Sequence, residues 1–145
     1  ARHELTSRRV TVRAVSSADI PLVLGDRVQL QQVLLNLIVN AMDAMKSMPE
    51  ERRLLTIRGC EDVQHDTRAA TISVQDRGTG LSGVEVGRLF EAFYTTKPHG
   101  MGIGLAISRS IIEEHGGRLW AEEADPGPGA NFSFTVPARD LHDQS

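Results

Sequence analysis

The chain has 145 residues, 40% of them hydrophobic and 24% charged, with a formal net charge of −3. These values are typical of one globular domain with its own core, and the charge gives no general attraction to nucleic acid or anionic membranes. The single Cys60 excludes an internal disulfide and a zinc cluster built on cysteines, and it indicates a reducing compartment.

The sequence shows no signal peptide and no apolar run of bilayer-spanning length. We therefore expect a soluble, cytoplasmic domain, and this is compatible with a membrane-anchored parent protein. The chain begins without an initiator Met, which indicates a processed or cloned piece of something longer.

Hydrophobic alternation and helical periodicity predict the elements in chain order. The first half contains a tether at residues 1–7, strands at 10–15 and from Pro21, a helix at 26–48, and a hairpin of strands at 54–63 and 69–76. The second half contains a glycine-rich region at 77–104 with a short helix at 84–89, a helix at 105–115, and a hairpin of strands at 117–123 and 130–136 that Pro137 ends.

This order predicts an α/β fold. We expect a two-layer sandwich in which a mixed, mostly antiparallel β-sheet is covered on one face by about three helices. In the helix at 105–115, the apolar residues expected to be buried are Leu105, Ile107, Ile111 and Ile112. His115 and Gly116 form its C-terminal stop, where a side chain that can carry positive charge suits the helix dipole.

The long helix carries a narrow polar face. Asp26, three residues before Gln29, predicts a capping box at its start. Five polar residues fall within a sector roughly 80° wide on a helical wheel: Gln29, Gln32, Asn36, Asn40 and Asp43. Neutral amides can line an anion site, and their oxygens can ligate a hard cation. A buried helix whose polar groups satisfy neighbouring groups gives the same pattern, so both interpretations stay open from this helix alone.

Two glycine clusters follow. DRGTG, from Asp76 to Gly80, comes directly after a predicted strand, and GMGIGL at 100–105 opens the second helix. A glycine-rich helix start exposes backbone N–H groups that suit phosphate, Lys97 could add a point charge, and Asp76 could accept a hydrogen bond from an amino group such as that of adenine. Turn-forming glycines are the commoner explanation of either cluster alone. The spacings match neither a dinucleotide fingerprint nor a P-loop, and the sequence lacks the motifs of ordinary protein kinases and of serine hydrolases.

Four motifs occur in order: QLQQVLLNLIVNAMDA, DRGTG, FEAFYTTK and GMGIGLAIS. Together they resemble the N, G1, F and G2 boxes of the catalytic, ATP-binding domain of bacterial sensor histidine kinases, a family that shares the Bergerat ATP fold with gyrase-type ATPases, Hsp90 and MutL. The resemblance covers residues 8–137 and leaves 138–145 as a C-terminal tail. Within the family, the short stretch between the F and G2 boxes is most similar to oxygen- and nitrogen-responsive kinases.

The resemblance implies a site for Mg²⁺ and ATP, with Asn36 and Asn40 as its catalytic residues. Asn40 would ligate Mg²⁺, and Asn36, one turn earlier, would lie beside the phosphates and help to hold the metal. Asp76 would bind the adenine amino group, with Gly78 and Gly80 allowing close approach of the base. The phosphates would be held by Lys97, Gly100, Gly102, Gly104 and Leu105. Phe90 and Phe93 would pack the base of the ATP lid, and they also fit the pattern of core aromatics. Thr95 and Thr96 would contribute to closure of the lid or only to its hinge.

Two positions depart from the family pattern. Asp43 stands where some relatives carry Lys or Arg near the phosphates, so a carboxylate there would have to face solvent, waters of the metal or a basic partner. Asn36 stands where the hydrolytic relatives carry a Glu that activates water. Because an amide cannot act as that base, we expect poor ATP hydrolysis and a reaction kept for an external nucleophile.

The resemblance also implies partners. Family members phosphorylate a His on a separate dimerisation domain, a two-helix hairpin of the same parent protein, and act indirectly on a response regulator; residues 1–7 would be the tether to that hairpin. His3 is not expected to be the acceptor, because too few residues surround it to build two helices. We expect a monomer with no nucleic acid partner and no direct membrane insertion. Two alternatives stay open: an ATP-sensing or docking module without turnover, and a gyrase- or Hsp90-like ATPase, which Asn36 disfavours.

Overall fold

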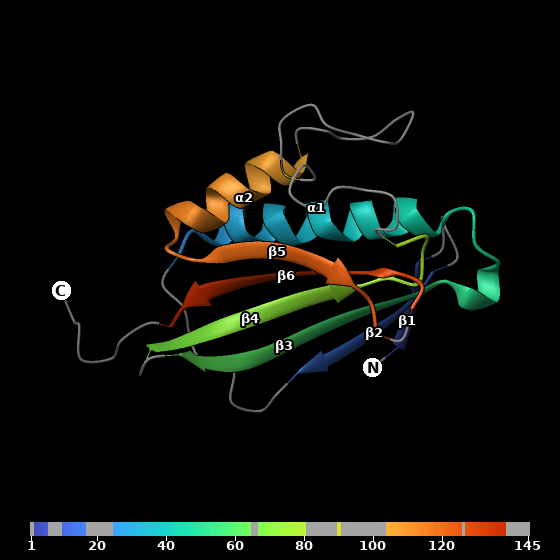
Figure 1. Ribbon diagram of the computed structural model, residues 1–145, viewed down its shortest axis with the longest axis horizontal. Coiled ribbons are helices and arrows are strands. Elements are labelled where there is room, and N and C mark those ends of the chain that lie inside the picture. The colour runs from blue at the N-terminus through green and yellow to red at the C-terminus, as the bar shows by residue number, and fades with distance from the viewer. Residues whose placement is uncertain are drawn as a thin grey trace.

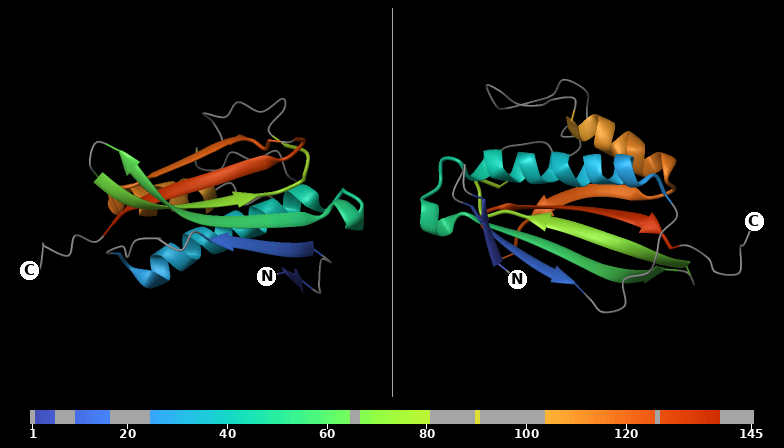
Figure 2. Two further views of the ribbon diagram at one scale, coloured as in Figure 1. Left: turned by 90° about the horizontal axis from the view of Figure 1, so that it is seen from below. Right: turned by 180° about the vertical axis from the view of Figure 1, so that it is seen from behind.

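The computed structural model describes residues 10–16, 25–64, 67–80, 90, 104–125 and 127–138, and the backbone of residues 2–5. Within these residues, a sheet forms one layer and two α-helices form the second layer on one of its faces (Figure 1, Figure 2). The helices are α1 (Arg27–Met45) and α2 (Gly104–Glu114), with a short 3-10 turn η1 (Glu50–Arg52). The strands are β1 (Arg2–Leu5), β2 (Val10–Ser16), β3 (Leu54–Gln64), β4 (Thr67–Gln75), β5 (Arg118–Glu123) and β6 (Ala130–Pro137).

The sheet is mixed and mostly antiparallel, as the sequence predicts. Its six strands lie in the order β1-β2-β3-β4-β6-β5. Only β2 and β3 run parallel among these pairs, and α1 makes the crossover between them. Both expected hairpins are present, with Ile57 opposite Val74 in the first and Leu119 opposite Phe134 in the second.

The N-terminal residues differ from the expectation of a tether alone. Arg2–Leu5 forms β1 and pairs antiparallel with β2, with His3 opposite Val12. That these residues lead to a further domain stays a prediction. The expected strand from Pro21 and the expected short helix at 84–89 lie outside the described residues, so the described helices number slightly fewer than the predicted three.

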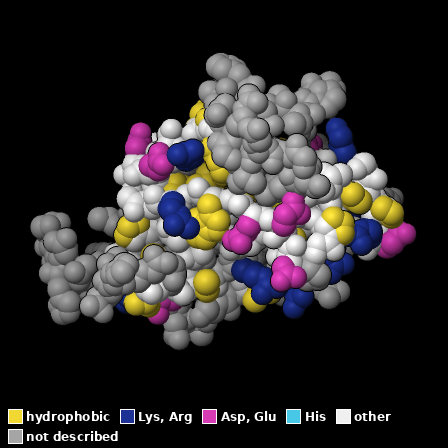
Figure 3. Space-filling view, in the orientation of Figure 1, with side chains coloured by type: hydrophobic (Ala, Val, Ile, Leu, Met, Phe, Trp, Pro, Cys, Tyr) yellow, Lys and Arg dark blue, Asp and Glu magenta, His cyan; other side chains and the backbone are white. Residues whose placement is uncertain are grey.

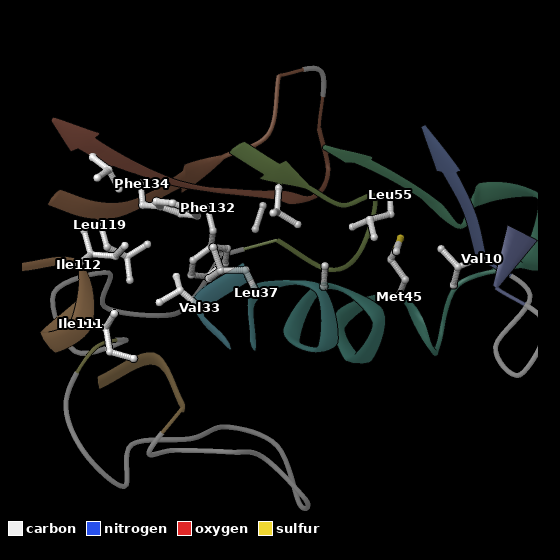
Figure 4. Packing of buried hydrophobic residues seen from close by; sticks show 14 residues of the cluster. Val10, Val33, Leu37, Met45, Leu55, Ile111, Ile112, Leu119, Phe132 and Phe134 are labelled. Atoms are coloured by element: carbon white, nitrogen blue, oxygen red, sulfur yellow. The ribbon is translucent and has the colours of Figure 1, made fainter. Parts of the chain in front are cut away.

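The core lies between the helix layer and the sheet. One stripe of α1 recurs every four residues and is almost completely buried: Val33, Leu37, Ala41 and Met45. It packs against the covered face of the sheet, where Phe132 and Phe134 of β6 and Leu55 of β3 belong to the same cluster (Figure 4). This spacing is what an amphipathic helix needs to cover a sheet, and the packing fixes which faces of α1 remain available for other groups.

In α2, the expected burial holds for Ile111 and Ile112 and is wrong for Ile107. Ile107 is 41% exposed, while Leu105 is half-buried. The buried arc of α2 is centred on Ser108, which is completely buried. Ile107 precedes Ser108 by one residue, which places it about 100° away around the helix, at the edge of that arc.

The surface of the described residues carries both signs of charge. Acidic and basic side chains are interspersed on the face seen in Figure 3 rather than gathered by sign, in keeping with the net charge of −3. None of the described helices has the length and hydropathy needed to span a membrane.

Candidate functional site

The polar face of α1 turns partly toward α2. Asn36 and Asn40 are half-buried, and the side-chain amide nitrogen of Asn36 donates to the hydroxyl oxygen of Ser108 at 3.1 Å. One of the five polar residues therefore satisfies a buried neighbour, as one of the two interpretations of this face predicted. The same contact ties the predicted N box to Ser108, the last residue of the predicted G2 box.

A second link joins the opposite ends of the two helices. Asp26 caps α1 by accepting the backbone N–H of Gln29 at 3.1 Å, as predicted. The backbone N–H of Asp26 donates to Nε2 of His115 at 3.0 Å, while the His115 Nδ1 lies 2.7 Å from the carbonyl oxygen of Ile111. Nε2 of His115 thus accepts a hydrogen bond from the start of α1. Only one of the two hydrogen bonds of the predicted capping box is formed, the one that the Asp26 side chain accepts. The backbone N–H of Asp26 donates to His115 instead of to the side chain of Gln29.

These two links make α1 and α2 an antiparallel pair (Figure 1). Asn36 lies about 15 Å along α1 from Asp26, and Ser108 lies about 10 Å along α2 from His115. One further turn along each helix leads to Asn40 on α1 and to Gly104 at the start of α2. At the start of α2, the first backbone N–H groups have no partner within the helix, and they and the positive end of the helix dipole suit an anion.

Asp76 is fixed where β4 ends and β6 begins. It is 1% exposed, and its Oδ1 accepts the backbone N–H groups of Gly78 at 2.8 Å and Ala130 at 3.2 Å. The backbone N–H of Asp76 donates to the carbonyl oxygen of Ala130 at 2.9 Å. A buried carboxylate held by two backbone donors has a defined orientation, as a base-reading group requires.

The glycines after Asp76 bring this loop against α1. A Cβ on Gly78 would lie 2.5 Å from the carbonyl oxygen of Ala44, which is one turn beyond Asn40. Gly80 has a φ of +81°, in the left-handed region that favours glycine. Both predicted glycines are thus needed locally, and Gly78 allows the loop to touch the C-terminal half of α1.

Two contacts link described segments that carry predicted site residues. Asn36 on α1 contacts Ser108 on α2, the helix that begins with Gly104 and Leu105, and the loop of Asp76 and Gly78 lies against Ala44 of α1. The other predicted members, Lys97, Gly100 and Gly102, lie outside the described residues, as do Phe93, Thr95 and Thr96. Phe90 is described and packs edge-on against Phe132, with ring centroids 6.4 Å apart.

Two residues of this region are missing from the sequence prediction: Ser108 and His115 in its link to Asp26. Ser108 was detectable in principle, since it lies four residues from both Gly104 and Ile112 on the buried arc of α2. A serine on an apolar stripe needs a hydrogen-bond partner. The link between His115 and Asp26 joins residues 89 positions apart and leaves no local pattern.

Comparison with known proteins identifies the family. The family model described as "Histidine kinase-, DNA gyrase B-, and HSP90-like ATPase" matches residues 25–140. The chain belongs to this family. The match includes α1, both glycine clusters and the closing hairpin, so the resemblance stated from the motifs is confirmed.

Relatives and a solved structure agree with this assignment. The chain is 48% identical to the sensor protein FixL of Bradyrhizobium diazoefficiens over 119 residues, covering 82% of this chain and 22% of FixL. It is 39% identical over 131 residues to the sensor histidine kinase TmoS of Ectopseudomonas mendocina, covering 90% of this chain and 13% of TmoS. The catalytic domain of histidine kinase ThkA superposes with a TM-score of 0.73 at 29% identity, covering 91% of this chain and 81% of that one. The chain thus spans less than a quarter of the length of FixL and of TmoS.

The residues present fit a metal that is held together with a nucleotide. Among the described residues, no group of three or more His, Cys, Asp and Glu side chains could hold a metal ion. α1 carries the amide oxygens of Asn36 and Asn40, and α2, which contacts Asn36 through Ser108, begins with a helix N-terminus of the kind that suits phosphate. Mg²⁺ is commonly bound by a few protein oxygens, waters and substrate phosphates, which matches this donor set.

Proposed function

We propose that this domain binds ATP with Mg²⁺ and transfers the γ-phosphoryl group to a histidine on a separate dimerisation domain, for two-component signalling. The observation that supports this best is the meeting of three segments: α1 with the amides of Asn36 and Asn40, the loop of Asp76 and Gly78 that lies against Ala44, and α2, which contacts Asn36 through Ser108. A purine, a phosphate chain and a cation together need these three kinds of surface.

The adenine end of the proposed site lies at the Asp76 loop. Oδ1 of Asp76 takes both backbone hydrogen bonds, so the carboxylate orientation is fixed before any ligand arrives. The second oxygen, Oδ2, accepts the adenine amino group in this proposal. Gly78 and Gly80 give the base close approach to the backbone.

The phosphate end lies at the start of α2. The backbone N–H groups of Gly104 and Leu105 bind phosphate oxygens there, and Lys97, Gly100 and Gly102 complete the cradle. Asn40 would hold Mg²⁺ with help from Asn36, and the cation when bound supplies charge neutralisation of the phosphates. These residues bind and orient the phosphate chain, which is most of what phosphoryl transfer asks of a protein.

The transfer step needs a nucleophile from outside this chain. A ring nitrogen of the acceptor histidine forms the new P–N bond while the bond from the γ-phosphorus to the β–γ bridging oxygen breaks, and ADP leaves with that electron pair. Asn36 cannot remove a proton from water as a carboxylate would. The domain therefore hydrolyses ATP poorly and keeps the phosphoryl group for its partner.

The partner in this proposal is the helical hairpin of the same parent protein, and a response regulator is reached through it. The domain works on the cytoplasmic side, where ATP and the response regulator are present, and the piece alone is monomeric. Size-exclusion chromatography with light scattering tests the last point, and a stable dimer would contradict it.

A reconstituted reaction tests the proposal. The domain is mixed with the purified hairpin domain of its parent protein and γ-labelled ATP with Mg²⁺, and acid-labile phosphate on the hairpin is measured. We expect transfer by the wild type and by Gln32→Ala, a matched change at an exposed position of the same polar face, and none by Asn40→Ala. Nucleotide binding without transfer would favour the ATP-sensing module, and rapid phosphate release without the partner would favour the ATPase.

A further inference from the structure

The hydrogen bond between Asn36 and Ser108 has a direction. The amide nitrogen of Asn36 is the donor and the Ser108 oxygen is the acceptor, 3.1 Å apart. Ser108 is completely buried, and it is held on a helix whose neighbouring residues Ile111 and Ile112 are in the core. The acceptor is therefore fixed in space, and it determines which end of the Asn36 amide points toward α2.

A carboxamide has two unlike ends of nearly the same shape. Its nitrogen donates and its oxygen accepts, so only hydrogen bonding decides which way the group faces. A serine hydroxyl inside a helix can donate to the carbonyl oxygen one turn earlier, which leaves its own oxygen as an acceptor. The Ser108 oxygen accepts from the Asn36 nitrogen, which turns the Asn36 oxygen to the other side.

Asn40 lies one turn beyond Asn36 on the same face of α1. Side chains four residues apart on a helix have Cβ atoms about 6 Å apart, close enough for two oxygens to serve one cation and its waters. An Asn36 nitrogen at this place would instead repel a cation. The orientation set by Ser108 thus decides whether Asn36 supports the metal.

We propose that Ser108 is a positioning residue that keeps the Asn36 amide oxygen directed toward the magnesium end of the nucleotide site. This inference rests on the proposed function, because it assumes that Mg²⁺ and nucleotide bind beside Asn40. It assigns a role in the site to a side chain that touches neither ligand.

The first experiment measures the affinity of this chain for the β,γ-imido analogue of ATP, with excess Mg²⁺ and with excess EDTA. Ser108→Ala lowers the affinity with Mg²⁺ by about fivefold to tenfold, the worth of one hydrogen bond, and changes the metal-free affinity by less than about twofold. Ser108→Thr keeps the hydroxyl and restores the Mg²⁺ dependence. Ser110→Ala, the same change at an exposed position of α2, leaves both affinities unchanged.

A double-mutant comparison separates positioning from packing. In an Asn36→Ala background there is no Asn36 amide for Ser108 to orient, so adding Ser108→Ala causes no further loss of affinity with Mg²⁺. If Ser108→Ala lowers affinity equally with and without Mg²⁺, or lowers it again in the Asn36→Ala background, Ser108 is only a packing residue and the inference is overturned.

The second experiment needs no nucleotide. In ¹⁵N NMR spectra of the nucleotide-free chain, the side-chain NH₂ resonances of Asn36 shift in Ser108→Ala and stay near their wild-type positions in Ser108→Thr. Unchanged resonances in Ser108→Ala would show that the contact does not hold the amide, which overturns the inference alone. A wild-type chain with no affinity for the analogue at any Mg²⁺ concentration would overturn the proposed function, and this inference with it.

Discussion

Two stripes of α1 have the same helical periodicity and differ in burial. The apolar stripe, Val33 to Met45, is at most 2% exposed and fills the space between the helix layer and the sheet. The polar stripe carries Asn36 and Asn40, which are only half-buried, and Asn36 contacts Ser108 of α2. The first stripe stabilises the fold through shape and buried area, and in the proposed function the second holds chemical groups in place for another molecule.

The difference between the stripes lies in what fixes each side chain. Apolar residues need only neighbours of suitable volume, so the packing energy is distributed over many contacts. A polar side chain at the site needs a partner of the right kind, as Asn36 has in Ser108. Substitutions in the two stripes should therefore separate stability from binding, and the following predictions run from the largest expected change in the free energy of unfolding to the smallest.

The apolar stripe is tested by Leu37→Ala. Leu37 is completely buried, so the change removes packed methyl groups and leaves a cavity, which costs about 2–5 kcal/mol of unfolding free energy. Urea denaturation followed by circular dichroism measures it. Leu35→Ala is the matched control, since Leu35 is on the same helix and 58% exposed, and we expect a change within about 0.5 kcal/mol. Similar losses in the two variants would break the comparison.

Asp76 contributes both to stability and to the proposed binding of adenine. Asp76→Ala leaves the buried N–H groups of Gly78 and Ala130 without their acceptor, which costs about 2–4 kcal/mol, and it removes the proposed adenine contact. Asp76→Asn keeps an oxygen for these donors and replaces the other oxygen with a donor. We expect most of the stability to return but not the affinity for adenine nucleotides, as measured by denaturation and isothermal titration calorimetry. Wild-type affinity in Asp76→Asn would exclude Asp76 as the residue that reads adenine.

Much of the fold was predictable because its signals are local. Asp26 marks the start of α1, the four-residue recurrence of apolar residues marks its buried face, and alternation marks both hairpins. The order of the motifs predicts the family, which the match over residues 25–140 confirms. Each of these signals is contained in a single element or in the order of elements.

Other features depend on which elements meet in space. The pairing of β1 with β2, the exposure of Ile107 and the approach of Gly78 to Ala44 follow from packing between elements. The acceptor for Asn36 lies 72 residues away. Periodicity describes one element at a time, so it can indicate that a polar residue needs a partner but cannot say which one.

The link between the far ends of α1 and α2 tests whether a hydrogen bond away from the site affects only stability. His115→Ala removes the acceptor of the Asp26 N–H and the contact with the Ile111 carbonyl, at a cost of about 1–2 kcal/mol. We expect nucleotide affinity to stay at the wild-type value at temperatures where the variant is folded. Glu114→Ala, at the adjacent exposed position, should change neither quantity. A loss of affinity in His115→Ala would mean that this end of the helix pair sets the geometry of the site.

Asn40→Ala should give the smallest change in stability and a large change in binding. The side chain is half-buried, and Ala gains about 0.5 kcal/mol of helix propensity over Asn, which offsets the loss of the amide contacts. Denaturation should therefore show a change within about 0.5 kcal/mol. Affinity for ATP with Mg²⁺ should fall by at least about tenfold, as expected when a buried charged ligand loses a partner worth about 1.5 kcal/mol or more.

The stability and the nucleotide affinity of Asn40→Ala test the comparison between the two stripes most directly. Asn40 in the polar stripe is adjacent in sequence to Ala41 in the apolar stripe. If Asn40→Ala instead lowers stability as much as Leu37→Ala and leaves affinity for ATP with Mg²⁺ unchanged, the polar stripe of α1 is part of the structural core. The amides would then satisfy neighbouring groups and nothing more, which is the alternative that the sequence alone leaves open.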